Sequence, residues 1–382
     1  MENLNFTKFS NDKEFLYSVI TLTIIISIVL LFFTWITSIV TLNNNNCTKY
    51  KKKFDNLHVL YPQRKINFSS CTNTSRSDYC NETSSSLRNY YIKTAYNCCN
   101  ADGFKNNWVH LCAMEYALKL GVRCLDFEIY SMNDNPVIAV SLDQKNYHIK
   151  ESYNKIDFSD ALTVISNKAF SESYCPNWND PLILHFRIMT ENLEILDKMA
   201  YKLKEKLKNT LGKDYSYENS KENMGEVSLK DLLNKVIIIV DKSKANPNTT
   251  KLDEYVNLTS NSMFMRSIPF HDVKYSHDLQ ELINFNKKNM TMCYPDLKIN
   301  MENPSPQLIK AAGCQFIAMT FQNINDNLVY YNKMFNDEES AFILKPKDLR
   351  HDPKTIVTPS PPNPELGYRT RVYKGDYYKI TT

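Results

Sequence analysis

The longest apolar stretch of the chain lies near its N-terminus. Residues 16–42 hold 27 positions without a charged side chain, and a helix of that length reaches roughly 40 Å, enough to cross a hydrocarbon core of about 30 Å. A buried core helix would keep a polar stripe, and a cleaved signal peptide has a shorter apolar region followed by a small-residue cleavage site. Here Asn43 to Asn46 follow instead. The pattern predicts an uncleaved transmembrane helix over 16–42.

Beyond this helix the chain is first polar and then alternates between two periodicities. Residues 43–89 are rich in Ser, Thr and Asn and predict a stalk. Apolar positions at helical spacing predict a helix over 108–120, which Gly121 ends before a strand over 122–130. Further strands are expected at 136–140, 181–188, 235–240, 315–321 and 341–344, and further helices at 158–170, 193–211 and 229–233.

Short apolar strands that alternate with longer helices indicate parallel βα units. Several such units in one chain predict an α/β protein with a closed TIM-type (β/α)8 barrel. The tail carries five prolines and then a basic, Tyr-rich end, so a flexible extension is expected, with a docking peptide as the alternative. The expected organisation is a short segment 1–15, the transmembrane helix 16–42, the stalk 43–89, the barrel 90–352 (first half 90–242, insertion 243–262, second half 263–352) and the tail 353–382.

Composition adds little to this picture. The net charge is only +4 and the basic residues are scattered, so no nucleic-acid partner is expected. An integral membrane association remains, and anionic lipid headgroups are compatible partners. The chain has 7 Gly and abundant Asn, Lys, Ile and Tyr, as in AT-rich genomes of protists and large DNA viruses. A virion membrane is therefore one location to consider.

The two signals for membrane sidedness disagree. More lysines follow the apolar stretch than precede it, and positive charge marks the cytoplasmic side; they are Lys49, Lys51, Lys52 and Lys53 against Lys8 and Lys13. Glycosylation triplets and a disulfide-like pair argue the other way; they are Asn67, Asn73, Asn81, Asn248, Asn257 and Asn289, with Cys71 and Cys80. Asn-rich sequence produces such triplets by chance, so a single-pass protein with a cytoplasmic barrel is predicted.

Two parts of the chain carry longer motifs. Residues 118–130 read LKLGVRCLDFEIY, residues 312–322 read AGCQFIAMTFQ, and residues 342–350 read FILKPKDLR, with Tyr294 and Pro295 ahead of the second motif. In this order they resemble the catalytic barrel of eukaryotic phosphoinositide-specific phospholipases C, over roughly 91–350. The resemblance implies a phospholipase C-like phosphodiesterase barrel.

In that family, two histidines and a calcium ion cleave a phosphodiester. The first histidine position holds Tyr96, and tyrosine, with an ordinary pKa near 10, is a poor base. The second holds Val140, which transfers no proton. His148 lies in a polar loop and is expected to be a surface residue. No catalytic residue is therefore assigned, and the barrel is expected to be a pseudoenzyme.

The family's calcium ligands are only partly kept. Asn97, Asp126 and Glu128 match ligand positions, and the two acids alternate along a strand and so face the same side. The remaining acid position holds Arg187. A guanidinium can neutralise two carboxylates without a metal, so we expect Arg187 to replace calcium. No cofactor is expected, and Asn97, Asp126 and Glu128 would be metal ligands only if calcium is retained.

Of the phosphate-binding positions, Lys242 matches a family lysine and Tyr294 is kept, whereas Val240 and Met292 replace basic residues. The leading hypothesis is a membrane-anchored, catalytically degenerate protein that acts as a binding or structural component, with a protein partner that the sequence does not identify. One alternative is an active hydrolase with a rearranged site, Tyr96 as acid and His110, His148 or His185 as base. The other is a headgroup binder that uses Lys242 and Tyr294 without cleavage.

Overall fold

The computed structural model describes residues 5–60, 86–143, 145–216, 223–299, 301–351, 367 and 369–382. The chain divides into two units, Met1–Arg350 and His351–Thr382. Cys71 and Cys80, with the triplets at Asn67, Asn73 and Asn81, lie outside the described residues.

The larger unit is built around a parallel sheet. Among the described residues, eight parallel strands follow the order β7-β6-β5-β2-β1-β10-β9-β8. They are β1 Tyr90–Ala95, β2 Cys124–Met132, β5 Leu182–Ile188, β6 Val236–Asp241, β7 Leu258–Ser260, β8 Met265–Pro269, β9 Met290–Tyr294 and β10 Phe316–Met319. The two ends of this order, β7 and β8, lie in contact without a ladder between them, so the barrel is nearly closed. The predicted TIM-type barrel is confirmed.

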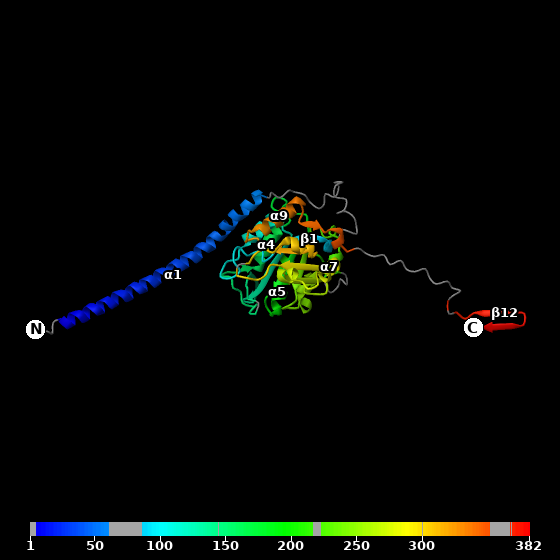
Figure 1. Cartoon of the computed structure of the whole chain (residues 1–382), viewed down its shortest axis with the longest axis horizontal. Helices are drawn as coiled ribbons and strands as arrows, with labels where there is room; N and C mark the ends of the chain where they lie inside the picture. Colours follow the sequence, from blue (N-terminus) through cyan, green and yellow to red (C-terminus); the bar gives the residue numbers. More distant parts are fainter. Residues whose placement is uncertain are drawn as a thin grey trace. The chain divides into compact units, whose positions relative to one another are not determined.

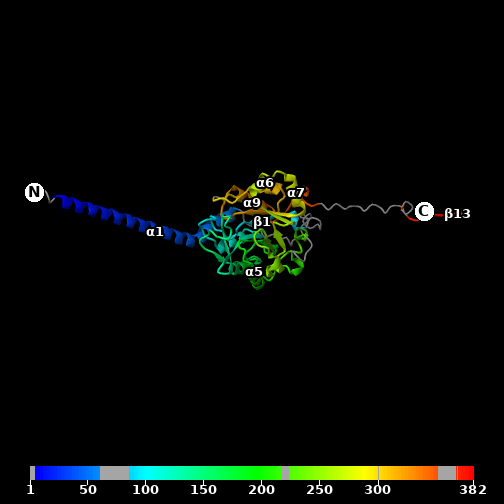
Figure 2. The ribbon, with the colours of Figure 1, turned by 90° about the horizontal axis from the view of Figure 1, so that it is seen from below.

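Helices cover the strands on the outside. In two views at right angles, β1 lies centrally with α9 and α5 on opposite sides (Figures 1 and 2). A parallel strand covered on both faces reads as a continuous apolar run, and β6, with sequence VIIIVD, is buried at every position. The helices of the barrel are α3 Leu111–Lys119, α4 Phe158–Lys168, α5 Leu193–Lys206, α6 Phe270–Lys274, α7 Leu279–Lys288, α8 Pro306–Ala311 and α9 Asp326–Asp337.

Two of the predicted strands lie outside the parallel order. β3, Asn135–Ala139, pairs antiparallel with β2 and then with β4, Ile156–Asp157. Its turn residues Asn133 and Asp134 both have positive φ, as a two-residue hairpin requires. The expected strand 136–140 is therefore a hairpin arm rather than a barrel strand. β11, Phe342–Leu344, pairs antiparallel with β1.

Other expectations need correction. Residues 229–233 form turns rather than a helix, and β7 lies inside the stretch expected as an insertion, 243–262. Strands β8 and β9 were not predicted as strands, because both are short and mix apolar with polar residues. Short 3-10 turns fill several connections: η3 Leu87–Asn89, η4 Lys213–Tyr215, η5 Met224–Glu226, η6 Pro247–Thr249, η7 Lys251–Tyr255 and η8 Lys347–Leu349.

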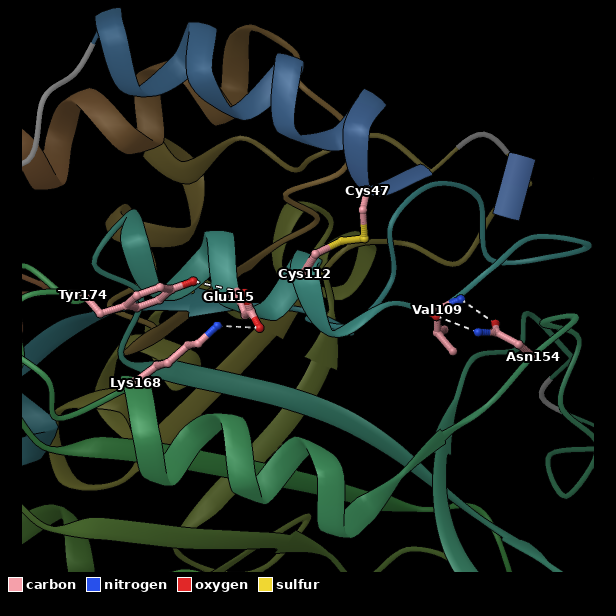
Figure 3. Close-up of a disulfide and its surroundings, with 7 residues drawn as sticks. All are labelled: Cys47, Val109, Cys112, Glu115, Asn154, Lys168 and Tyr174. Carbon is pink, nitrogen blue, oxygen red and sulfur yellow. Dashed lines mark hydrogen bonds and ion pairs between the residues drawn. A yellow bond between two sulfur atoms is a disulfide. The ribbon is translucent and has the colours of Figure 1, made fainter. Parts of the chain in front are cut away.

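The N-terminal helix is longer than expected. Helix α1 spans Asn5–Leu60, so residues 43–60 of the predicted stalk continue it. Its segment Lys13–Ile39 has a mean hydropathy of 2.7 and no burial, and is long and apolar enough to cross a membrane, although a signal sequence meets the same criteria. Nearer its C-terminal end, Tyr50 and Phe54 are buried, and Cys47 forms a disulfide with Cys112 of α3 (Figure 3).

The smaller unit contains a β-hairpin at the end of the chain. β12, Val372–Gly375, pairs antiparallel with β13, Tyr378–Thr381. The tail was expected to be a flexible extension, so its last residues are more regular than predicted. Its aromatic side chains, Tyr373, Tyr377 and Tyr378, are exposed.

Candidate functional site

Two neighbouring strands supply the centre of the site. β2 carries Asp126 and Glu128, and β5 carries His185 and Arg187, with Asp126 opposite His185 and Glu128 opposite Arg187 in the parallel register. Alternate residues of a strand point to the same side. The strand pairing alone therefore brings two acids, an imidazole and a guanidinium together inside the barrel, where all four are buried.

The Arg187 guanidinium lies between the two carboxylates. Its Nε and Nη2 atoms donate to the two oxygens of Asp126 at 3.0 and 2.8 Å, and Nη1 donates to Glu128 Oε1 at 2.8 Å. Its Cζ atom lies 4.5 Å from the centre of the Tyr96 ring, a cation–π contact. The planar guanidinium presents five N–H donors in a fork and therefore reaches both carboxylates at once. The compact ammonium group of a lysine would not match this geometry.

Both carboxylates are fully hydrogen-bonded by protein groups. Asp126 also accepts from the backbone N–H of Asn97 at 3.0 Å, and its Oδ1 lies 2.7 Å from His185 Nδ1. Glu128 also accepts from the Asn97 side-chain amide at 3.0 Å, the Tyr130 hydroxyl at 2.9 Å and the backbone N–H of Ser141 at 3.0 Å. A carboxylate offers about four lone-pair positions, so each acid accepts at or near its limit.

Asp126 and Arg187 each shift the pKa of the other toward the charged form. Burial alone would raise the pKa of Asp126, but the charge of Arg187 and the hydrogen bonds from His185 and Arg187 outweigh it and lower the pKa below its ordinary value. Burial would lower the pKa of Arg187, and the two acids and Tyr96 raise it instead. The ion pair between Asp126 and Arg187 therefore stays charged at neutral pH although it is buried.

Tyr96 keeps its proton in these surroundings. Burial raises the pKa of Tyr96 well above its ordinary value, although Arg187 acts against the shift. The ring stacks on Tyr294, with centroids 5.6 Å apart and planes 7° apart. Tyr96 is thus held between a cation and a second aromatic ring, and proton abstraction by its hydroxyl is disfavoured.

A cavity of about 260 Å³ opens above this cluster. Of the residues named from the sequence, Tyr96, Glu128, Arg187 and Tyr294 line it, and Asp126 lies beneath it. Sequence reasoning missed several further lining residues: Tyr130, Ser141, Asp143, Tyr147, Asp241, Lys244 and Asn261. Tyr130 follows Glu128 by two positions on the same strand, a signal that could have identified it.

The lysine that lines the cavity is Lys244 rather than Lys242. Lys244 lies over the ring of Tyr147, with Nζ 3.8 Å from the ring centre. Both lysines follow β6, where Asp241 faces the cavity and accepts two hydrogen bonds from Asn261, each 3.1 Å long. The chain turns after Asp241, so the position two residues beyond Lys242 reaches the cavity.

The three candidate histidines do not supply a base that faces the cavity. His185 touches Asp126, but it is fully buried and its other nitrogen lies 2.9 Å from the hydroxyl of Ser260. His148 is exposed beside Tyr147, and His110 precedes α3. None of the three lines the cavity. Val140 is buried and has no group that could transfer a proton.

The residues at the site do not fit a divalent cation. Calcium takes about six to eight oxygen ligands, whereas here the oxygens of Asp126 and Glu128 already accept from protein donors. Among the described residues, the one candidate ligand oxygen without a hydrogen-bond donor is Oδ1 of Asn97. The Arg187 guanidinium also repels a cation at this position. Calcium-assisted chemistry therefore has no place in this arrangement.

Comparisons with known proteins agree with the fold. Residues 83–242 match the phosphatidylinositol-specific phospholipase C X domain, and residues 233–348 match the Y domain of the same family. No curated protein matches the chain. Similar solved structures include PLC21 of L. pealei, at 19% identity with a TM-score of 0.56, and PLC21 of S. officinalis, at 19% identity with a TM-score of 0.55.

Each PLC21 comparison covers 69% of this chain and 38% of the other protein. The chain thus spans about two fifths of the length of these relatives. At this level of identity the two structures show the shared barrel fold. Both family domains match in chain order over most of the barrel, and the chain therefore belongs to the phosphatidylinositol-specific phospholipase C family.

Proposed function

We propose that this chain is a membrane-anchored member of the family that no longer cleaves phosphodiesters and acts by binding. One observation carries the proposal: Arg187 satisfies both carboxylates of the cluster at hydrogen-bond distances of 2.8 to 3.0 Å. Loss of one general acid or base typically costs about 100- to 10,000-fold in rate. The family's histidine positions hold Tyr96 and Val140, so both proton-transfer groups are absent.

A phosphodiesterase assay tests this proposal. Full-length protein in phosphatidylinositol vesicles would be assayed for release of water-soluble inositol phosphate, with calcium or with a chelator, beside an active calcium-dependent enzyme of the family. We expect no release above background. Calcium-dependent release that Asp126→Ala abolishes would overturn the proposal. Metal-independent release that is lost in His185→Ala or Tyr96→Phe would support the alternative, a rearranged hydrolase.

The cavity favours an uncharged polyol over a multiply phosphorylated headgroup. Its lining has three acidic residues, Glu128, Asp143 and Asp241, against the basic residues Arg187 and Lys244. Glu128 already accepts from protein donors, but the carboxylates of Asp143 and Asp241 can accept from ligand hydroxyl groups. The lining tyrosines offer flat surfaces to a ring. Binding without cleavage is therefore proposed for an inositol-like ring with few phosphates. Calorimetric titration with myo-inositol and with inositol trisphosphate tests this, because tighter binding of the trisphosphate would contradict it.

We propose that Lys13–Ile39 anchors the protein in a membrane. Its length and hydropathy support a span, and none of the segment is buried against the rest of the protein. Resistance of the protein to carbonate extraction, with no shortening of its N-terminus, is the expected result. Release of a shortened protein into the soluble fraction would instead indicate a cleaved signal sequence.

The disulfide favours a different sidedness from the one that the lysines predict. Cys47 and Cys112 are 65 residues apart and join α1 to the barrel. Disulfides persist in oxidising compartments and are rare in the cytosol. We therefore favour a barrel on the non-cytosolic side, against the expectation from Lys49 to Lys53. Protection of the barrel from protease in sealed membranes would support this side. A virion location stays a prediction from composition alone.

A further inference from the structure

The end of α1 that follows the membrane segment packs on α3 in a defined direction. Cys47 is bonded to Cys112, Tyr50 packs against Ala113 and stacks on Tyr116, and Phe54 contacts the Tyr116 ring at 4.6 Å between centroids. Contacts that advance together along both helices mean that the two helices run in the same direction. Figure 3 shows the disulfide between them.

The direction of α3 relative to the barrel is set by its place in the chain. It links the C-terminal end of β1, at Ala95, to the N-terminal end of the parallel neighbour β2, at Cys124. Such a helix must begin at the barrel end where the strands finish and run back to the opposite end. The cavity of the candidate site lies at the end where the strands finish, which we call the mouth.

Because α1 runs parallel to α3, the part of α1 that precedes Cys47 leaves the barrel beyond its mouth. The membrane segment ends at Ile39, eight positions before Cys47 in the chain. A helix rises about 1.5 Å per residue, so this connection is about 12 Å long. No glycine or proline occurs in α1, so the usual causes of a sharp kink are absent.

We propose that the mouth of the barrel faces the bilayer that α1 crosses, and that the Cys47–Cys112 disulfide fixes this orientation. The proposal rests on the membrane anchoring proposed above. It commits the mouth to one partner, the lipid surface, which lies about two helix turns from Cys47. A ligand of the cavity would then come from the lipid headgroups or from a molecule held against the membrane.

The attachment point on the barrel is itself held in place. Glu115 of α3 forms an ion pair with Lys168 of α4 at 2.7 Å, and the Asn154 side chain makes two hydrogen bonds of 2.8 Å with the backbone of Val109, just before α3 (Figure 3). Tyr50 and Phe54 are 5% and 6% exposed. The anchor helix is therefore joined to a part of the barrel that other contacts hold in place. The direction of α1 then determines the orientation of the whole barrel.

Two tryptophans report on the two ends of the barrel. Trp108 lies between β1 and α3, at the mouth, and Trp178 lies between α4 and β5, at the opposite end. Strands of about six residues place the two ends roughly 20 Å apart. Energy transfer from tryptophan to a dansyl group on lipid headgroups falls steeply over such a distance, so the two positions give different signals.

The experiment uses the full chain in vesicles that contain a dansyl-headgroup lipid. Trp35, within the membrane segment, is replaced by Phe in every variant. One variant also carries Trp178→Phe and so reports from Trp108, and the other carries Trp108→Phe and reports from Trp178. Carbonate extraction is measured first on both. We expect several-fold more transfer from Trp108 than from Trp178.

The outcomes separate this inference from the proposed function. Equal transfer, or more transfer from Trp178, in protein that resists carbonate extraction would overturn the orientation and leave the anchor and the loss of catalysis standing. Loss of carbonate resistance would remove the anchor and the orientation together, without touching the phosphodiesterase result. A helix break by Asn44→Gly with Asn45→Pro should remove the difference between the reporters while the protein stays in the membrane. An unchanged difference would show that α1 does not set the orientation.

Discussion

Arg187 stands opposite Glu128 in the β2–β5 register, yet it holds Asp126 with two hydrogen bonds, of 3.0 and 2.8 Å, and Glu128 with one of 2.8 Å. A single side chain of β5 thus neutralises both acids of β2. This counter-charge is a side chain of the protein and not an exchangeable ion. The cluster is therefore part of the folded core, and its loss should lower the free energy of unfolding.

Removal of the guanidinium should destabilise the protein strongly. Arg187→Met leaves Asp126 and Glu128 buried without a counter-charge, and breaking a buried pair costs about 3 to 5 kcal/mol. Urea unfolding of the full chain in detergent measures the loss at neutral pH. The control is Arg266→Met, which breaks the exposed pair with Glu281, exposed by 37% and 53%, and should cost less than about 1 kcal/mol. Equal effects of the two substitutions would contradict the assignment.

The same variant should change the pH dependence of stability. The folded-state pKa of Asp126 lies below its ordinary value, so its contribution is present above about pH 4 and is lost as the pH falls through the folded pKa. Without Arg187, burial raises that pKa, and stability should fall as the pH rises through about 4. The difference in unfolding free energy between wild type and Arg187→Met should therefore shrink in acid. A constant difference from neutral pH to about pH 3 would contradict this account.

Calcium should bind only after the guanidinium is replaced by an acid. The wild-type thermal midpoint should not respond to calcium, because Arg187 occupies the carboxylates. Arg187→Glu places a third carboxylate beside Asp126, Glu128 and the unpartnered Oδ1 of Asn97, a set of hard oxygen ligands. We expect calcium to raise the midpoint of this variant. Arg187→Met is the matched control and should not respond, and a calcium response of the wild type would refute the argument.

The barrel could be predicted from motifs that turn out to be structural. In the sequence AGCQ, Gly313 takes a φ of +74°, a conformation that favours glycine. Gln315 donates to the carbonyls of Arg88, Asn286 and Asn289, and Lys345 of the sequence LKP also donates to Asn286, at 3.1 Å. These contacts hold the strand ends together, so the motif identifies the fold and says nothing about the chemistry of the site beside it.

The rest could not be predicted because it depends on contacts between distant segments. The parallel packing of α1 on α3 depends on the contact between Tyr50 and Tyr116. The sequence around Tyr50 is rich in Asn and Lys, and no local pattern there predicts this contact. Lys244 reaches the cavity because of a turn after β6, which periodicity does not reveal. By contrast, the pairing of Arg187 with the two acids follows from the alternation of side chains along a strand and from the alignment of β2 with β5. Both are regular features of a sheet, so they could be predicted.

The disulfide should contribute measurably to stability. A loop of 65 residues corresponds to about 4 kcal/mol in the chain-entropy treatment. Cys112→Ser should lower the unfolding free energy by about 2 to 4 kcal/mol and leave Cys47 open to a maleimide. In the wild type, neither residue should react before reduction. Reaction of Cys47 in freshly isolated, unreduced wild-type membranes would contradict both the bond and the sidedness inferred from it.

Lys93 lies in the core, 1% exposed, and donates to the backbone carbonyl of Leu120 at 2.6 Å. Burial lowers its pKa to about 7, below an unfolded value of about 10.4. Between these values the unfolded chain binds the extra proton, so this lysine destabilises the fold most near neutral pH and less as the pH rises. Lys93→Met should therefore stabilise the protein near pH 7, and its advantage over wild type should shrink by about 3 kcal/mol as the pH rises to about 10. Lys204→Met, at an exposed position of α5, should show no such trend, and a pH-independent advantage of Lys93→Met would mean that the buried ammonium keeps its ordinary pKa.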